Sequence, residues 1–159
     1  MSSSQPLNRY QPSLEERVSV LILRAADFVG QRGERLLKSH GLTSTQYNVL
    51  RILRGAGPEG LPCKSVGDRM ISHDPDMTRL LDRMEKRGLI GRERQKDDRR
   101  VVKTRITASG LEILKKLDQP IRELHKKHFE HISVAKLKQL AELLGECQKP
   151  APNGDSEAS

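Results

Sequence analysis

The middle of the chain concentrates side chains that could bind a polyanion. Arg79 and Arg83 stand four residues apart, the spacing that places two side chains on one face of a helix, and Thr78 adjoins them. Arg99 and Arg100 follow in a charged loop. Guanidinium and hydroxyl groups donate hydrogen bonds to phosphate oxygens and to the edges of bases, so nucleic acid fits this pattern. Solvated surface arginines, and a locally neutral turn formed with Asp97 and Asp98, fit the same residues.

The overall charge agrees with a polyanionic partner. The chain has 29 Lys and Arg against 21 Asp and Glu, a net charge of +8, and residues 79–105 alone hold eleven basic and five acidic residues. Composition by itself leaves nucleic acid, an anionic membrane and an acidic protein open. Two Tyr, two Phe and no Trp are too few rings for a stacking platform, which argues against single-stranded nucleic acid.

The pattern of apolar residues predicts mainly helices, with one short hairpin to carry the charged loop. Apolar side chains recur at helical spacing from Ser13 to Gly41. After Gly88 the pattern changes to short alternating or β-branched segments, which predicts a β-hairpin. The expected order is helices over 13–40, from 44 to the segment 55–60, over about 62–70 and over 74–87, strands over 89–94 and 101–107, and helices over 109–148.

Three helix boundaries carry specific signals. Ser13, followed by Glu16 three residues later, predicts a capping box. Asp74 followed by Pro75 predicts the N-cap and the first position of the fourth helix. Gly88 is the expected stop of that helix, because glycine readily adopts the conformation that ends one.

The predicted fold class is mainly α with a small β-hairpin wing, a winged helix-turn-helix with long dimerisation helices. In such a module one helix enters the major groove and the hairpin reaches the adjacent backbone or minor groove. The run DPDMTRLLDRMEKRGLIGRERQKDDRRVVKTRITASG, residues 74–110, resembles the signature of the MarR family of transcriptional regulators. The resemblance covers about residues 13–148. It implies a homodimer with interleaved first and last helices, a palindromic double-stranded DNA site, and a small-molecule effector that weakens DNA binding.

The same resemblance assigns roles to individual residues. The arginine that the family's wing inserts into the minor groove falls on Arg100, and the aspartate that braces the wing falls on Asp98. The candidate DNA-binding residues are Ser72, His73, Asp76, Thr78, Arg79, Arg83, Arg99 and Arg100. Asp74 and Asp76 depart from the family's pattern, since carboxylates repel phosphates. Either they cap the helix and favour its dipole, or Asp76 accepts a hydrogen bond from a cytosine amino group.

The two ends of the chain are polar and lack apolar periodicity. We therefore expect a single domain with extensions on both sides. The expected parts are a flexible arm over 1–12, one domain over 13–149 in which helices 13–40 and 109–148 dimerise and residues 44–107 form the winged helix-turn-helix, and a disordered tail over 150–159.

Other reactive side chains show weaker patterns. His125, His128 and His131 are spaced three apart, and Cys63 and Cys147 stand far apart without metal-type spacing, so we expect neither a metal nor a cofactor. No phosphate-binding glycine loop, HExxH or GxSxG motif occurs, which predicts no enzymatic activity. The absence of a signal-peptide pattern and of any stretch of about 18 apolar residues predicts a cytoplasmic protein without a membrane partner.

Two other functions fit a basic helical protein. The chain could be an adaptor whose basic face binds an acidic protein, or an architectural DNA binder with little sequence preference. Binding to a palindromic duplex and to a random duplex separates them. An adaptor would bind both weakly and equally, and an architectural protein would bind both with a steep salt dependence.

Overall fold

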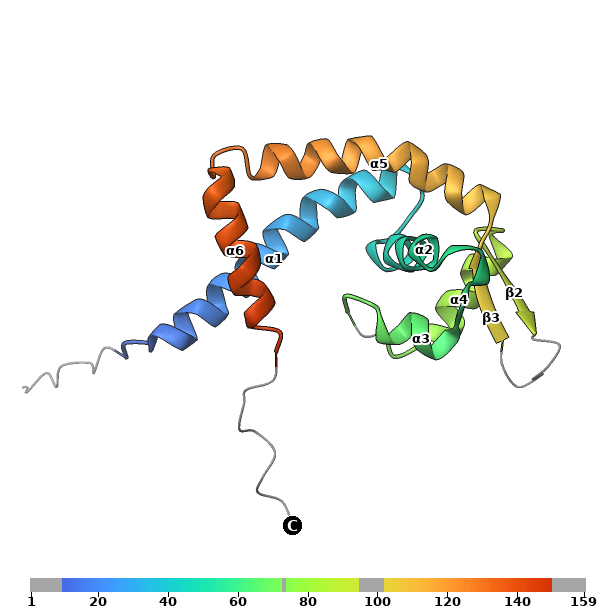
Figure 1. Ribbon diagram of the computed structural model, residues 1–159, viewed down its shortest axis with the longest axis horizontal. Coiled ribbons are helices and arrows are strands. Elements are labelled where there is room, and N and C mark those ends of the chain that lie inside the picture. The colour runs from blue at the N-terminus through green and yellow to red at the C-terminus, as the bar shows by residue number, and fades with distance from the viewer. Residues whose placement is uncertain (1–9, 73, 95–101, 150–159) are drawn as a thin grey trace, which may run out of the picture. The chain divides into compact units, whose positions relative to one another are not determined.

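The computed structural model describes residues 10–72, 74–94 and 102–149 (Figure 1). Contacts divide the chain into two compact units, Met1–Asp118 and Gln119–Ser159. In chain order the elements are α1 (Leu14–Ser39), α2 (Ser44–Ala56), the 3-10 turn η1 (Gly57–Glu59), β1 (Leu61–Pro62), α3 (Cys63–Asp68), α4 (Met77–Lys86), β2 (Ile90–Arg94), β3 (Val102–Ile106), α5 (Ala108–His128) and α6 (Val134–Glu146). The predicted class, mainly α with a small β-hairpin wing, is confirmed.

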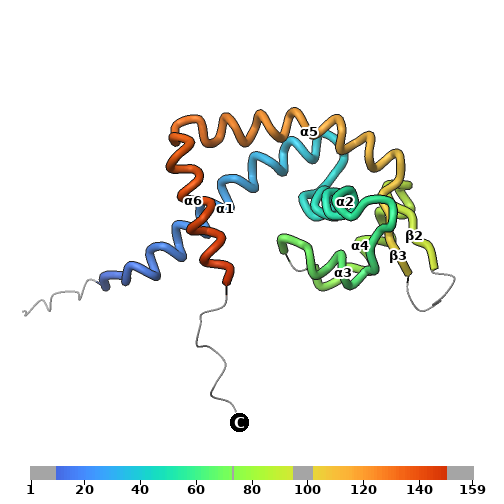
Figure 2. Tube along the Cα trace, in the orientation of Figure 1, coloured from blue at the N-terminus to red at the C-terminus, as the bar shows by residue number. Residues whose placement is uncertain are grey.

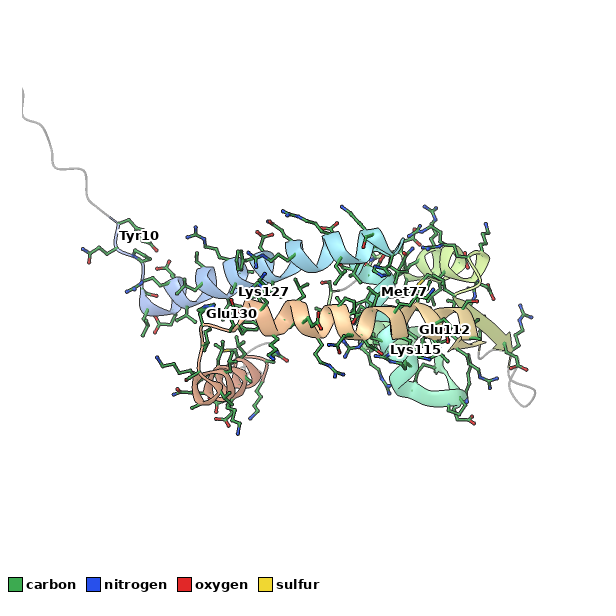
Figure 3. The ribbon with its side chains drawn as sticks, turned by 90° about the horizontal axis from the view of Figure 1, so that it is seen from above. Tyr10, Met77, Glu112, Lys115, Lys127 and Glu130 are labelled. Carbon is green, nitrogen blue, oxygen red and sulfur yellow. The ribbon has the colours of Figure 1, made fainter. Side chains whose placement is uncertain are left out.

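Helix α1 begins and ends as the sequence predicts. The Ser13 side chain accepts a hydrogen bond from the Glu16 N–H, and the Glu16 carboxylate accepts one from the Ser13 N–H, so the capping box is present. The Tyr10 hydroxyl, just before α1 (Figure 3), also donates to Glu16 and is the main cause of the lowered pKa of that carboxyl. At the other end Gly41 has φ +69°, and the Leu42 N–H reaches back to the Leu37 carbonyl at 3.0 Å.

The hairpin predicted after Gly88 is confirmed, and a third strand joins it. Strands β2 and β3 are antiparallel, with Arg92 opposite Thr104, and β1 pairs with the other edge of β3 to give the order β1-β3-β2. Strand β1 is not predicted from the sequence, because it is only two residues long and forms by pairing with a distant segment. Gly60 before it has φ +64°, and a Cβ there would lie 2.4 Å from the Thr104 carbonyl oxygen. Only glycine allows the two strands to approach so closely.

The start of α4 corrects the prediction. Asp74 and Pro75 do not open the helix: Asp76 is the N-cap, and its side chain accepts from the Arg79 N–H at 3.3 Å. Asp74 Oδ1 instead accepts the Asp76 N–H at 2.9 Å, which closes a local turn. The helix therefore begins only at Met77, because the Asp74 side chain accepts the Asp76 N–H in a turn that precedes the helix.

The end of α4 leads directly into the wing (Figure 2). Gly88 has φ +69°, its N–H donates to the Glu85 carbonyl at 2.8 Å, and the Leu89 N–H donates to the Met84 carbonyl at 3.0 Å. This is the glycine stop that the sequence predicts. The Thr107 hydroxyl then donates to the Gly88 carbonyl at 2.6 Å, which ties the end of the hairpin to the end of the helix.

The hydrophobic core of the module comes from α2, α4, the hairpin and the first half of α5. Its fully buried side chains include Leu50, Leu53, Leu81, Met84 and Leu114. Arg54 of α2 adds a two-point ion pair with Asp118 of α5, at 2.8 and 2.9 Å. None of the helices within the described ranges is long and apolar enough to cross a membrane.

Candidate nucleic-acid interface

One face of α4 is apolar and the opposite face carries donors. Leu80, Leu81 and Met84 are buried. Thr78, Arg79 and Arg83 are exposed, and Arg79 and Arg83 lie one helical turn apart on the same side. The structure thus brings these three predicted residues together on one solvent-facing surface. We call this surface, with Lys86 on the following turn, the α4 basic face.

Arg92 of β2 holds the two carboxylates that α4 carries beside this face. Its Nε and Nη2 donate to Glu85 Oε2 at 2.9 and 2.6 Å, and Nη2 also reaches Asp82 Oδ1 at 2.5 Å. The Arg92 backbone N–H donates to Glu85 Oε1 at 3.2 Å. The arginine side chain is only 25% exposed, so a largely desolvated cation fixes α4 to the wing.

This ion-pair cluster offsets part of the negative charge on α4, whose three cations already outnumber its two carboxylates. The hydrogen bonds to Glu85, with a smaller contribution from Asp82, raise the pKa of Arg92, so the guanidinium remains protonated. Among the described residues, neither Arg83 nor Lys86 pairs with a carboxylate. Arg92 thus pairs with both carboxylates of α4, and Arg83 and Lys86 face solvent without a carboxylate partner among the described residues.

A side chain of α2 contacts the loop that precedes α4. Asn48 Oδ1 of α2 accepts the Ile71 N–H at 2.8 Å. Ser72, next in the chain, is exposed and belongs to this loop. His73 lies outside the described residues. Sequence reasoning missed Asn48, because its partner is 23 positions away and belongs to an irregular segment.

Arg87 positions the other end of α4. Its Nη1 donates to Gln46 Oε1 at 3.1 Å and its Nη2 donates to the Gly41 carbonyl at 2.7 Å. Both partners belong to the turn between α1 and α2 or to the start of α2. The sequence places Arg87 at the end of the helix, directly before the Gly88 stop. It does not predict the contacts with Gln46 and Gly41, because these residues are more than 40 positions away.

The base of the wing carries its own ion pairs. Arg105 Nη1 of β3 contacts Glu93 Oε2 of β2 at 2.8 Å, and Lys103 Nζ lies 3.7 Å from a carboxylate oxygen of Glu59. Arg94, the last residue of β2, is exposed. Three site predictions of the wing tip fall on 95–101, outside the described residues: Asp98, Arg99 and Arg100. Their roles remain predictions.

The cysteines and histidines of the described ranges lie apart from the α4 basic face or from one another in the sequence. Cys63 is half-buried and Cys147 is exposed, and both are free thiols. His128 is buried beside Phe129, with ring centroids 5.0 Å apart. Within the residues that the structure describes, no group of three or more His, Cys, Asp or Glu side chains could hold a metal ion.

Comparison with known proteins identifies the family. The model of the MarR family matches residues 42–102, which run from the start of α2 to the start of β3. A crystal structure of a MarR transcription factor from Planctomyces limnophilus is 34% identical, with a TM-score of 0.65, and the alignment covers 86% of this chain and 98% of that one. The chain belongs to the MarR family. Its described elements form the winged helix-turn-helix of this family of transcriptional regulators.

Two further proteins extend the comparison. An uncharacterized HTH-type transcriptional regulator, YkoM of Bacillus subtilis strain 168, is 33% identical over 101 residues, which is 64% of each chain. This chain therefore spans slightly less than two thirds of that relative. The Staphylococcus aureus MepR–DNA complex has the same fold, with a TM-score of 0.74 at 19% identity over 86% of this chain and 97% of that one.

Proposed function

We propose that this chain is a cytoplasmic, non-enzymatic transcriptional regulator that binds double-stranded DNA sequence-specifically as a homodimer on a pseudo-palindromic operator. Each subunit places the α4 basic face in a major groove, with half-sites about one helical turn (~10 bp) apart. A small-molecule effector that lowers DNA affinity, as the family resemblance implies, completes the proposal.

The observation that carries the proposal is the sorting of charge on α4. Asp82 and Glu85 are held by Arg92, while Thr78, Arg79 and Arg83 are exposed. A helix with this arrangement offers donors to base edges and cations to phosphates without presenting those two carboxylates to them. The MepR fold neighbour, solved with DNA, supports this use of the fold.

Exposed apolar side chains support the homodimer. On α1, Leu14, Leu21 and Leu23 are each more than 60% exposed, and a hollow of about 720 Å³ lies along the same stretch of the helix. On α6, Val134 and Leu143 are more than half exposed. Exposed apolar surface on long helices marks a site for another protein, and a second copy of the same helices supplies a matching one.

The wing supplies the second contact of each subunit in this proposal. Arg100 enters the minor groove and Arg99 contacts the backbone, while Asp98 braces the loop. The ion pair between Arg105 and Glu93 supports it, because it joins the two strands at the base of the hairpin. Ser72 and His73, in the segment that precedes α4, contact the DNA.

Selection of bound sequences from a random duplex pool tests the proposal. We expect enrichment of an inverted repeat, two chains per duplex, and an affinity that falls steeply as salt rises. Enrichment of no sequence, with strong binding at low salt, would favour an architectural protein. Weak, equal binding to every duplex would favour an adaptor for an acidic protein.

A further inference from the structure

We infer that Asp76 is a specificity-determining residue, because its carboxylate holds Arg79 in the orientation that reads a guanine in the major groove. This inference rests on the proposed function, since it names the base that one side chain of the α4 basic face selects. The sequence leaves two roles open for Asp76: it caps the helix, or it accepts a hydrogen bond from cytosine. In this inference Asp76 caps the helix and affects base recognition through Arg79.

The two residues are joined at two points. Asp76 Oδ1 accepts the backbone N–H of Arg79 at 3.3 Å, and Asp76 Oδ2 lies 3.2 Å from Arg79 Nε. The carboxylate is itself fixed, because Asp76 is the N-cap of α4 and its own N–H donates to Asp74 Oδ1 at 2.9 Å. Both carboxylate oxygens therefore contact Arg79, which favours an action of Asp76 through that side chain over acceptance from a cytosine amino group.

The ion pair leaves the reading edge of Arg79 free. A guanidinium has five N–H donors, and the atom that bears one of them, Nε, lies 3.2 Å from Asp76 Oδ2. The four on the two Nη atoms remain, and the Arg79 side chain is 79% exposed. Guanine presents two acceptors, O6 and N7, to the major groove, and two parallel donors match them; adenine presents a donor in place of O6. The geometry thus selects guanine over adenine.

Pre-orientation explains what an exposed ion pair contributes here. Such a pair adds little to the stability of the free protein, because water screens it and two side chains lose rotamer freedom. In a complex the same pair has already restricted Arg79, so less freedom is lost on binding guanine than from an unrestrained arginine. A non-cognate base gains nothing from this restriction.

Asp76 also carries a cost that gives the inference a distinctive test. A carboxylate on the DNA-facing end of α4 repels phosphates whatever the sequence. Its removal should therefore leave binding to random DNA unchanged or tighter, while discrimination at one base pair falls. A role confined to the structure of the helix would instead lower affinity for all duplexes together.

The experiment compares Asp76→Asn with Arg79→Ala on the operator selected by the wild-type chain. Asparagine is as good an N-cap as aspartate, so the helix start is kept and only the charged partner of Nε is lost. Asp74→Asn is the matched control, because it removes an equal charge two residues away while the amide oxygen of asparagine can still accept the Asp76 N–H. Each variant is measured against duplexes carrying all four bases at each operator position, and its thermal unfolding is recorded.

We expect Arg79→Ala to lose about tenfold or more of the preference for one guanine per half-site, in line with a bidentate contact. Asp76→Asn should lose about three- to tenfold at the same base pair, with random-duplex affinity unchanged or higher. Asp74→Asn should keep the preference.

Three results would overturn the inference: a preference for a base other than guanine at the Arg79 position, an unchanged preference in Asp76→Asn, or a loss in Asp76→Asn at a different base pair. A wild-type chain without any sequence preference would overturn the proposed function itself. A selective wild type whose Asp76→Asn variant stays selective would remove only the role of Asp76.

Discussion

The winged module and the outer helices use apolar side chains in opposite ways. In the module, Leu50, Leu53 and Met84 are fully buried, and charged side chains such as Arg92 are paired across elements. Along the first half of α1 the leucines face solvent, with Leu21 62% and Leu23 70% exposed. The first region has a complete core of its own, whereas the second has apolar surface that nothing in one chain covers within the described residues.

This difference separates two functions along the chain. A region with a closed core and sorted charges can present a fixed chemical surface, here the α4 basic face. A region with exposed leucines lowers its free energy by burying them against another molecule, at about 25 cal/mol per Å² of apolar area. We therefore expect the outer helices to bind a second copy of the chain, and the module to recognise DNA.

The largest effect should follow from placing a charge among the exposed leucines. Leu21→Asp should convert the dimer to a monomer, and DNA affinity should fall about 100-fold or more, because two linked half-site contacts become independent. Light scattering after size exclusion and fluorescence anisotropy measure the two changes. Lys38→Ala, which removes only an exposed ion pair with Glu34 at the far end of α1, serves as the control. An unaltered dimer in Leu21→Asp would assign the exposed leucines to something other than self-association.

A buried leucine of the module should behave in the opposite way. Leu50→Ala should lower the free energy of unfolding by about 2–5 kcal/mol, through lost burial and the cavity left behind, without dissociating the dimer. Urea unfolding and light scattering report these two properties. Similar loss of dimer in both leucine variants would mean that the two regions form one cooperative core.

The wing tip provides a test that is separate from both cores. Arg100→Ala should weaken operator binding by more than about tenfold and make its salt dependence shallower, because one cation leaves the DNA surface. Folding and dimerisation should be unaffected, since Arg100 contributes to neither in this account. Anisotropy titrations at several salt concentrations give both numbers, and an unchanged affinity would remove the wing from the interface.

A smaller effect should come from opening the ion-pair cluster beneath α4. Arg92→Ala frees Asp82 and Glu85 beside the DNA, and we expect operator affinity to fall about three- to tenfold. Adding Asp82→Asn and Glu85→Gln to this variant should restore most of the affinity, because the repulsive charges are then gone. Failure of the triple variant to recover would show that Arg92 acts on the position of α4 rather than on its charge.

The sequence predicts the elements of the module better than the contacts among them. The capping box of α1, the Gly88 stop and the hairpin follow from local residue types, because caps and turns depend on neighbours within a few positions. The start of α4 was placed too early, since Asp74 closes a turn in competition with the helix. Strand β1 was missed because its partner is about 40 residues away.

The candidate site shows the same division. Thr78, Arg79 and Arg83 could be predicted to share a face, because helical spacing alone decides it. The pairing of Arg92 with Asp82 and Glu85 could not, since it requires the hairpin to fold back on α4. That fold-back is a tertiary contact. It pairs both carboxylates of α4 with Arg92 and leaves the cations of the α4 basic face exposed.

The most direct test of the central claim is the stoichiometry and selectivity of DNA binding by the full chain, measured by analytical ultracentrifugation and anisotropy on the selected operator and on a scrambled duplex. The account predicts two chains per operator, with at least about a thousandfold preference over the scrambled duplex at physiological salt. A stable monomer that binds both duplexes equally at low salt would contradict it.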